Sequence, residues 1–526
     1  MVNRSNGEKL CGAVAVTLFC LMAIVPLGYM VVRSVYGNDG VSFAAYREVL
    51  NDSRQWGLML RSLRVAAGTA LAATLLGVPA GFALEYLRVP ARRALAFVFA
   101  VPVLVPPYIW TVAWIDLFGK QGPLGSVMDI YSVSGVIFVL ATAWYPLVAL
   151  MTALAIRRLD SRAEEAARMA VSPVRTFLGV TVPLVLPGVV AGSGFVFLLA
   201  LVNFGVPSLL QVNVYPVEIY ARFNAFHDFA GATAAALPMV AIVTVLLGLM
   251  AAFLKNRYVM PTTVHDRQAR GRSLLRYVAA VYLWTIAAGS AGIPALALIR
   301  SSMPVTSYVH AWQTAHSELI QSLVLAAITA TVLVILGFAL AYRIQSGRGV
   351  ARFIMRAGVL APFAVSGPVL GIGSILLWNR PGPAGMIYGS ALIVVISVAA
   401  RFMFFAEEGF SAAFRSVHPE LEEAAIVAGV PWWSRVGRVV APMVYPTFVA
   451  VWGLSFVLAL QELAVTVLVS PPGLTTLPVR LFTLMHYGPN SLVSALCVLM
   501  TVVMLAGAAV PALIYIRVER GRHVRR

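Results

Sequence analysis

The sequence predicts an all-α protein that crosses a membrane about twelve times, as two parallel repeats of six helices. This prediction rests on composition, on the spacing of apolar segments and on an internal duplication. Of the 526 residues, 60% are hydrophobic and 11% are charged, and the mean hydropathy is +0.86. A water-soluble protein cannot bury that much apolar surface, so we expect a polytopic membrane protein.

Twelve apolar segments are long enough to cross the hydrocarbon core, which takes about 20 residues of helix. The first covers residues 11–32 and follows Arg4 and Lys9, as a signal peptide would. It is long and lacks a convincing cleavage site, so we interpret it as a retained anchor. The remaining segments are 63–87, 94–118, 133–156, 184–211, 232–254, 275–299, 319–342, 353–378, 386–409, 443–469 and 493–516.

The duplication is visible as matching sequence. Residues 62–70 (SLRVAAGTA) match residues 322–330 (SLVLAAITA), and GFAL with a tyrosine two residues later recurs at 81–86 and 337–342. An even number of spans gives both halves one orientation, which predicts a pseudo-two-fold axis along the membrane normal and a path at the interface. We divide the chain into a first half, 1–254, a basic linker, 255–274, and a second half, 275–526.

The basic residues behind the net charge of +18 are concentrated in the loops on one side of the membrane. With a cytoplasmic N-terminus, 28 of the 39 Lys and Arg residues lie in cytoplasmic segments, ten lie outside, and Arg401 lies within a span. This is the positive-inside pattern, and it predicts that both termini are cytoplasmic. The basic charge is therefore a topology signal, and we expect no nucleic-acid partner.

Two segments on the predicted cytoplasmic side are each predicted to form a short helix, a turn and a second helix. The second, residues 422–442 (EEAAIVAGVPWWSRVGRVVAP), has carboxylates in its first turn, Gly429 as a left-handed stop and Pro431 at the start of the next helix. The first, residues 164–183 (EEAARMAVSPVRTFLGVTVP), has capping-box spacing between Ser161 and Glu164, and a second helix from Ser172 and Pro173.

Both segments resemble the EAA loops of ABC-importer permeases, with the pattern EAA, three residues, Gly, nine residues, Ile, any residue, Leu-Pro. In the first loop, counting back from Pro183 puts Glu164 on the Glu and Ala170 on the Gly, whereas counting from Glu165 puts Val171 there. Either count leaves the Gly absent. The resemblance implies loops at 157–183 and 411–442 that couple to an ATPase through Glu164, Glu165, Ala166, Ala167, Ala170, Glu422, Glu423, Ala424, Ala425 and Gly429.

The fused halves, with VPPY at 105–108, NFGVP at 203–207 and QEL at 461–463, resemble the ferric-iron, thiamine and phosphonate branch of these permeases. The resemblance implies a non-enzymatic permease subunit of the bacterial inner (plasma) membrane. It would move ferric iron, or alternatively thiamine, phosphonate, polyamine or sulfate, from a soluble binding protein to the cytoplasm. Its partners would be two ATPase copies, the binding protein and membrane lipid.

Several classes of site and transporter are not favoured. The chain has no GxxxxGK[ST] loop, so we expect ATP and Mg to bind the separate ATPase and no cofactor to bind here. Its three cysteines have no metal-ligand spacing, and we predict no metal site. An ion-coupled secondary transporter is the less favoured class, because inverted repeats and several intramembrane carboxylates would be expected of it.

Asn203 and Glu462 are the candidate path residues, because an offset of 259 residues places one on the other. A carboxylate in an apolar span usually faces a cavity or a bundle interior. Two interpretations of Asn203 and Glu462 are equally favoured. Their side chains line the translocation path, or they form a structural hydrogen bond between helices. Pro106 and Pro107 break the third span, which shapes a cavity or serves packing alone. The external segment 215–228 is expected to dock the binding protein, although Fe³⁺ would accept its oxygen and imidazole groups.

Overall fold

The computed structural model describes residues 6–37, 40–87, 89–159, 161–255, 273–416 and 419–524. This part of the chain is almost entirely helical. A hairpin of two strands, β1 (Tyr36–Gly37) and β2 (Gly40–Val41), is the only sheet within the described residues. The prediction of an all-α polytopic protein is therefore confirmed.

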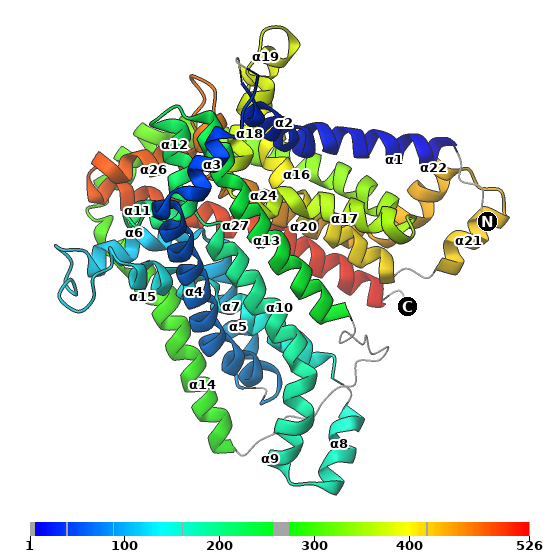
Figure 1. Ribbon diagram of the computed structural model, residues 1–526. Coiled ribbons are helices and arrows are strands. Elements are labelled where there is room, and N and C mark those ends of the chain that lie inside the picture. Colours follow the sequence, from blue (N-terminus) through cyan, green and yellow to red (C-terminus); the bar gives the residue numbers. More distant parts are fainter. Residues whose placement is uncertain are drawn as a thin grey trace.

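The first half runs from blue to green in Figure 1. Its first predicted span contains a π-helical turn, and a second π-helical turn directly precedes its fifth predicted span. Its helices are α1 (Asn6–Phe19), η1 (Cys20–Ile24), α2 (Val25–Val35), α3 (Ala44–Asn51), α4 (Ser53–Glu85), α5 (Arg92–Leu104), α6 (Pro107–Phe118), α7 (Val133–Arg157), α8 (Ser161–Ala170), α9 (Pro173–Thr176), η2 (Phe177–Thr181), α10 (Val182–Leu201), α11 (Gly205–Leu209), α12 (Tyr215–Asn224) and α13 (Phe229–Lys255).

The second half repeats this order, and its two π-helical turns fall at the matching places, which supports the duplication. Its helices are α14 (Ser273–Ala287), η3 (Ala288–Gly292), α15 (Ile293–Ser301), α16 (Thr306–Gln345), α17 (Gly349–Ala364), α18 (Gly367–Trp378), α19 (Pro383–Tyr388), α20 (Leu392–Ser416), α21 (Pro419–Val427), α22 (Trp432–Arg435), η4 (Val436–Val440), α23 (Ala441–Met443), α24 (Tyr445–Leu460), α25 (Thr466–Val469), α26 (Leu477–Tyr487) and α27 (Asn490–Val524).

Helix covers the twelve predicted spans, but not all of them are straight. Eight helices in the described chain are long and apolar enough to cross a membrane alone, and three pairs qualify only together, across bends of 93°, 103° and 74°. The first two bends separate α5 from α6 and α17 from α18. The remaining predicted span is α20, which is long enough but carries Arg401, Glu407 and Glu408.

Each half is completed by the first span of the other. The α1–α2 span packs on α16 and α18 of the second half, and a Cβ on Gly373 would lie 3.0 Å from the carbonyl oxygen of Pro26. In return, α14 and α15 pack on α4 and α6 of the first half. The hydroxyl of Tyr282 donates to the carbonyl oxygen of Leu76 at 2.7 Å. The two halves are therefore interlocked.

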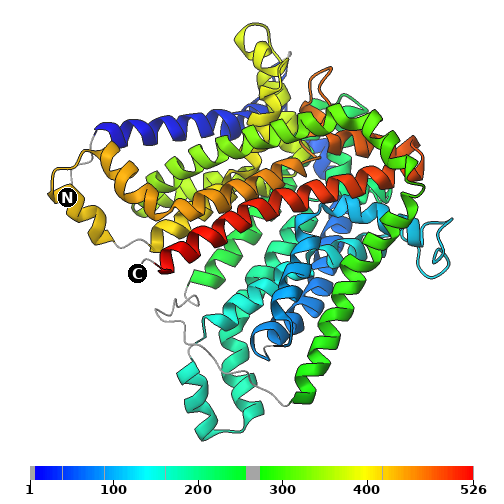
Figure 2. The ribbon, with the colours of Figure 1, turned by 180° about the vertical axis from the view of Figure 1, so that it is seen from behind.

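The two halves form arms that meet at one end and separate at the other. Figures 1 and 2 show α6, α11, α12, α15 and α26 gathered where the arms meet. At the far ends lie α8 and α9 on one arm and α21 and α22 on the other (Figure 1). The two predicted coupling loops thus occupy the tips of separate arms, at the same end of the molecule.

Small residues allow the longest helix of the first arm to pack closely. A Cβ on Gly77 of α4 would lie 2.7 Å from the carbonyl oxygen of Tyr145 on α7. Because that atom belongs to a helix backbone, it cannot move aside cheaply. Close approach of backbones through small residues is typical of membrane helices.

We expect Gly77→Val to destabilise the protein by about 1–3 kcal/mol through overpacking between α4 and α7. The matched control is Gly248→Val on α13, where a Cβ would have nothing within 4 Å. The measurement is the thermal unfolding midpoint of both variants in detergent. Equal midpoints would contradict the close packing of α4 against α7.

Candidate functional site

The second coupling loop is α21 followed by α22. Gly429 has φ +72°, and the N–H of Val430 donates to the carbonyl oxygen of Ala425 at 3.0 Å, as in a Schellman motif. The predicted left-handed stop at Gly429 is confirmed. The prediction that Pro431 is the first residue of the next helix is wrong by one position, because Pro431 is the extended residue before Trp432, where α22 begins.

The first coupling loop makes the same turn without a left-handed residue. The N–H of Val171 donates to the carbonyl oxygen of Ala167 at 2.9 Å, and the hydroxyl of Ser172 accepts from the N–H of Arg175 at 3.5 Å. Two residues separate α8 from α9, whereas four separate α21 from α22. The shorter connection explains why this loop needs no glycine.

A tyrosine at the end of the long helix holds the first loop. The hydroxyl of Tyr86 donates to Glu164 Oε1 at 2.6 Å, and Arg168 pairs with the same oxygen at 3.0 Å. Glu164 is only 3% exposed, whereas its neighbour Glu165 is exposed.

The second loop is held in the equivalent way. The hydroxyl of Tyr342 donates to Glu422, and Arg435 Nε lies 3.1 Å from Glu422 Oε1. Glu423 is exposed, as Glu165 is. Glu164 therefore corresponds to Glu422, and the EAA residues of the first loop are Glu165, Ala166 and Ala167, opposite Glu423, Ala424 and Ala425. Of the two registers that the sequence allows, the contacts select the one that puts Val171 opposite Gly429.

In both loops, two adjacent carboxylates have different roles. The inner one binds the tyrosine of α4 or α16, and the outer one faces solvent beside small side chains. Ala170 of the first loop is also exposed. Each short helix is thus bonded to a transmembrane helix while its outer face stays open, an arrangement that can transmit a push from a docked protein.

Sequence reasoning missed the residues that anchor the loops. The duplication already pairs Tyr86 with Tyr342, and this match was the available signal. Nothing in the sequence marks Glu8 of α1, whose Oε2 lies 3.8 Å from Arg435 Nη2. A Cβ on Gly7 would lie 3.2 Å from Nε1 of Trp433. The first span therefore supports the coupling loop of the opposite half.

The candidate path lies where helices break inside the membrane-spanning part. One pair of breaks is at the bends, at Val105–Pro106 and at Val365–Ser366. Pro106 is the extended residue before α6, and Pro107 is the first residue of that helix. Non-helical backbone at membrane depth is tolerated only where protein buries it or where it lines a cavity.

The second pair of breaks follows α10 and α24, at the predicted residues Asn203 and Glu462. Asn203 Oδ1 accepts from the N–H of Val206 at 3.0 Å, and Glu462 Oε1 accepts from the N–H of Val465 at 2.8 Å. Both side chains therefore satisfy backbone donors that the break leaves free. Their equivalent positions in the two halves agree with the predicted offset.

The breaks of the two halves meet. A Cβ on Gly205 would lie 3.6 Å from Cβ of Tyr108 in the same half and 3.7 Å from Cδ2 of Leu463 in the other. Tyr108 follows Pro107, and Leu463 follows Glu462. The structure thus brings the neighbourhoods of all four predicted path residues to the junction between the halves.

Within the described residues, an ion pair lies at this junction in the second half. Arg401 Nε lies 3.3 Å from Glu462 Oε2, and the two residues are 9% and 6% exposed. At the equivalent positions the first half has Thr142 and Asn203. Sequence reasoning did not pair Arg401 with Glu462, because 61 residues separate them.

The segment 215–228, which the sequence predicts to be external, forms an ion-pair cluster. Glu218 is 7% exposed, accepts from Arg54 Nη1 and Nη2 at 3.0 and 2.9 Å, and pairs with Arg222 Nε at 3.3 Å. Burial raises the pKa of Tyr215 to about 12, which disfavours the phenolate that a ferric ion would need. No group of three His, Cys, Asp or Glu side chains that could hold a metal occurs in the described ranges.

Comparison with known proteins identifies the repeated unit. The family described as binding-protein-dependent transport system inner membrane component matches residues 73–257 and again residues 333–522. A 2-aminoethylphosphonate transport system permease protein of Salmonella typhimurium is 26% identical over 241 residues, 43% of this chain and 82% of that protein.

Two further relatives match at similar identity. An ABC transporter permease protein of Sinorhizobium fredii is 25% identical over 454 residues, 79% of each chain. A molybdenum transport system permease protein of Mycobacterium tuberculosis is 30% identical over 211 residues, 38% of this chain and 80% of that protein. The chain therefore belongs to the inner membrane components of binding-protein-dependent transport systems, the ABC-importer permeases, and carries their transmembrane unit twice.

Proposed function

We propose that the chain supplies both membrane halves of an ATP-driven importer in the bacterial inner (plasma) membrane, with both termini in the cytoplasm. The observation that carries the proposal is the pair of coupling loops, each bonded through a Tyr–Glu contact to a long transmembrane helix. Each loop docks one copy of a separate ATPase, which binds ATP and Mg. A soluble binding protein delivers the solute from outside, and this chain carries out no chemical reaction.

Coupling follows from the contacts. When ATP closes the two ATPases, α8 and α21 move with the subunits docked on them. The Tyr86–Glu164 and Tyr342–Glu422 bonds transmit that movement to α4 and α16, so the arms rock about the junction of broken helices. Rocking of one repeat against the other is how alternating access is achieved around a fixed site.

The solute is proposed from the relatives. Two of them carry names that refer to 2-aminoethylphosphonate and to molybdenum. We therefore favour a small anion as the solute, in the class of phosphonate and sulfate. Ferric iron, which the sequence resemblance favours, remains the second candidate, and thiamine and polyamine rank after it.

The proposed stoichiometry is one permease chain with two ATPase copies, because each chain carries two coupling loops. Native mass spectrometry of the complex, purified with its cognate ATPase, measures the ratio directly. A stable permease dimer that carries two ATPases in total would contradict it.

The coupling proposal predicts an asymmetry between the loops. Gly429→Val should impair solute uptake more than Ala170→Val, because a β-branched residue at φ +72° is strained by roughly 1–3 kcal/mol while Ala170 is an ordinary helical residue. A Cβ at Gly429 would have nothing within 4 Å, so the strain comes from the backbone alone. Glu423→Ala should lower uptake without unfolding the protein, because Glu423 is exposed.

Uptake, ATPase co-purification and ATP turnover are compared in these three variants. The control is Gly437→Val in η4, where φ is not positive and a Cβ would also have nothing within 4 Å. Normal uptake in both Gly429→Val and Glu423→Ala would refute the claim that this loop transmits the movement of the ATPase to the membrane helices.

The solute proposal predicts uptake of anions by cells that express the permease with its ATPase and binding protein. Labelled 2-aminoethylphosphonate and sulfate should accumulate in an ATP-dependent way, whereas labelled ferric iron, thiamine and spermidine should not. ATP-dependent uptake of iron without uptake of either anion would reverse the order of the two candidates.

A further inference from the structure

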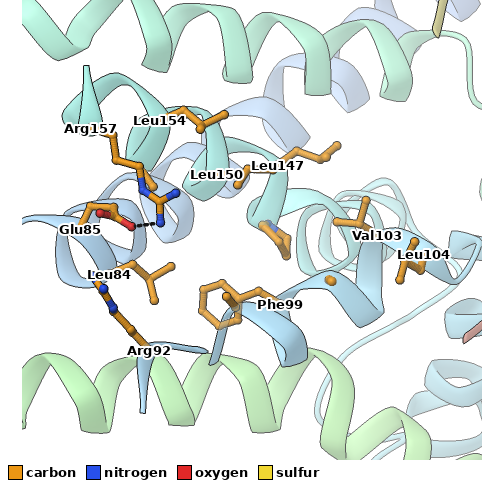
Figure 3. A pocket seen from close by; sticks show the side chains of 14 residues that line it. Leu84, Glu85, Arg92, Phe99, Val103, Leu104, Leu147, Leu150, Leu154 and Arg157 are labelled. Atoms are coloured by element: carbon orange, nitrogen blue, oxygen red, sulfur yellow. Dashed lines mark hydrogen bonds and ion pairs between the residues drawn. The ribbon is translucent and has the colours of Figure 1, made fainter. Parts of the chain in front are cut away.

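A cavity of about 440 Å³ lies in the first half, between α4, α5 and α7. This size is within the range of about 300–1,000 Å³ typical of small-molecule sites. Its wall on α5 includes Phe99, Val103 and Leu104, and its wall on α7 includes Pro146 and Leu150. Figure 3 shows Phe99, Val103 and Leu150 around this space. The body of the cavity therefore offers hydrophobic contact and almost no hydrogen bonds.

The charged residues of the cavity are gathered at one end. Arg157 pairs there with Glu85, and Arg92 lies beside them (Figure 3). Arg92 is exposed and has no ion pair within the described ranges. Helix α8 begins four residues after Arg157, so this end faces the coupling loops. The mouth thus carries two arginines and one carboxylate, a net positive charge.

The length of the cavity matches one leaflet of a bilayer. Arg92 and Leu104 are the first and last residues of α5, and the thirteen-residue helix spans about 18 Å. Half of a hydrocarbon core of about 30 Å is about 15 Å. A chain that enters beside Arg92 and extends along the apolar wall would therefore end near the bend between α5 and α6.

At the corresponding place in the described second half, aromatic rings gather. Val103 and Pro146 correspond in the duplication to Phe363 and Phe405. The rings of Phe363 and Phe405 lie 5.0 Å apart, and Phe195, from α10 of the first half, stacks on Phe363 at 6.0 Å. The side chains at this place therefore differ between the halves, and the lining of the cavity belongs to the first half.

We propose that this cavity binds one anionic phospholipid from the leaflet on the coupling-loop side. The headgroup phosphate binds between Arg92 and Arg157, and one acyl chain lies along the apolar wall to Leu104. Basic residues between transmembrane helices near the cytoplasmic surface are a recurring recognition mode for anionic headgroups. The Glu85–Arg157 pair holds the Arg157 guanidinium at the mouth.

The same cavity fits a small polar solute poorly. A hydrated anion that moved inward from the arginines would lose water against Phe99, Val103 and Leu150 without gaining hydrogen bonds, which is costly. An acyl chain gains free energy on the same surface with every methylene that it buries. The bound chain would end beside the break at Val105–Pro106, so lipid occupancy would act directly on one of the bends at the junction.

The test measures lipid retention on the purified full-length chain. The protein is incubated in mixed micelles with dioleoyl phosphatidylglycerol or dioleoyl phosphatidylcholine, and native mass spectrometry counts the bound lipid. Three variants are compared with the natural protein. Arg92→Gln removes one headgroup contact, Ala100→Phe fills the cavity, and Leu360→Phe makes the corresponding change in the second half.

We expect the natural protein to retain phosphatidylglycerol in preference to phosphatidylcholine. Arg92→Gln should weaken the retention of phosphatidylglycerol by about fivefold, the usual contribution of one arginine near an anionic headgroup. Ala100→Phe should abolish the retained lipid, and Leu360→Phe should change nothing.

Equal retention of the two lipids by the natural protein would overturn the proposal, as would unchanged retention in Ala100→Phe. Displacement of the bound lipid by added 2-aminoethylphosphonate or sulfate would assign the cavity to a small anion and also overturn the proposal. Retention is measured without transport, so this result is independent of the proposed importer function.

Discussion

Every backbone N–H and C=O group within the hydrocarbon must find a partner inside the protein, and the rest of this structure depends on that constraint. It makes the described chain almost wholly helical, and it makes the few exceptions informative. Among the breaks in the described helices, those beside Pro106, Asn203 and Glu462 meet at the junction of the halves. Asn203 and Glu462 bond the backbone donors that two of these breaks release. The breaks are the places where a path between the halves can open.

The duplication explains the arrangement, and the departures from it identify what is specialised. Both halves have a bent third span, paired π-helical turns and a first span that packs on the opposite half. They differ at the junction, where only the second half has the buried Arg401–Glu462 pair. A buried ion pair adds little net stability, but removing one partner is costly, so this pair constrains the second half at the junction.

The coupling loops show how one motif is anchored in two ways. Both inner carboxylates bind a tyrosine at the end of a long transmembrane helix, but their arginines come from different places. Arg168 lies one helical turn after Glu164, whereas Arg435 comes from the following helix and also faces Glu8 of the N-terminal helix. The second loop is therefore joined to three elements, so its position depends on both halves of the protein.

The sequence by itself determined the helical, polytopic fold class and the duplication, because these follow from local composition and from matching segments. The coupling-loop motif was identified by its resemblance to a known family. The sequence also placed Asn203 on Glu462 through the repeat offset. Only the tertiary structure decided which of two adjacent carboxylates faces inward, because neighbouring helical residues have similar composition and differ only in what they contact. The exchange of first spans, the Arg401–Glu462 pair and the contrast between the cavity and the ring cluster of Phe195, Phe363 and Phe405 were likewise beyond the sequence. They are contacts between residues far apart in the chain, and hydropathy along the chain carries no information about which helices become neighbours.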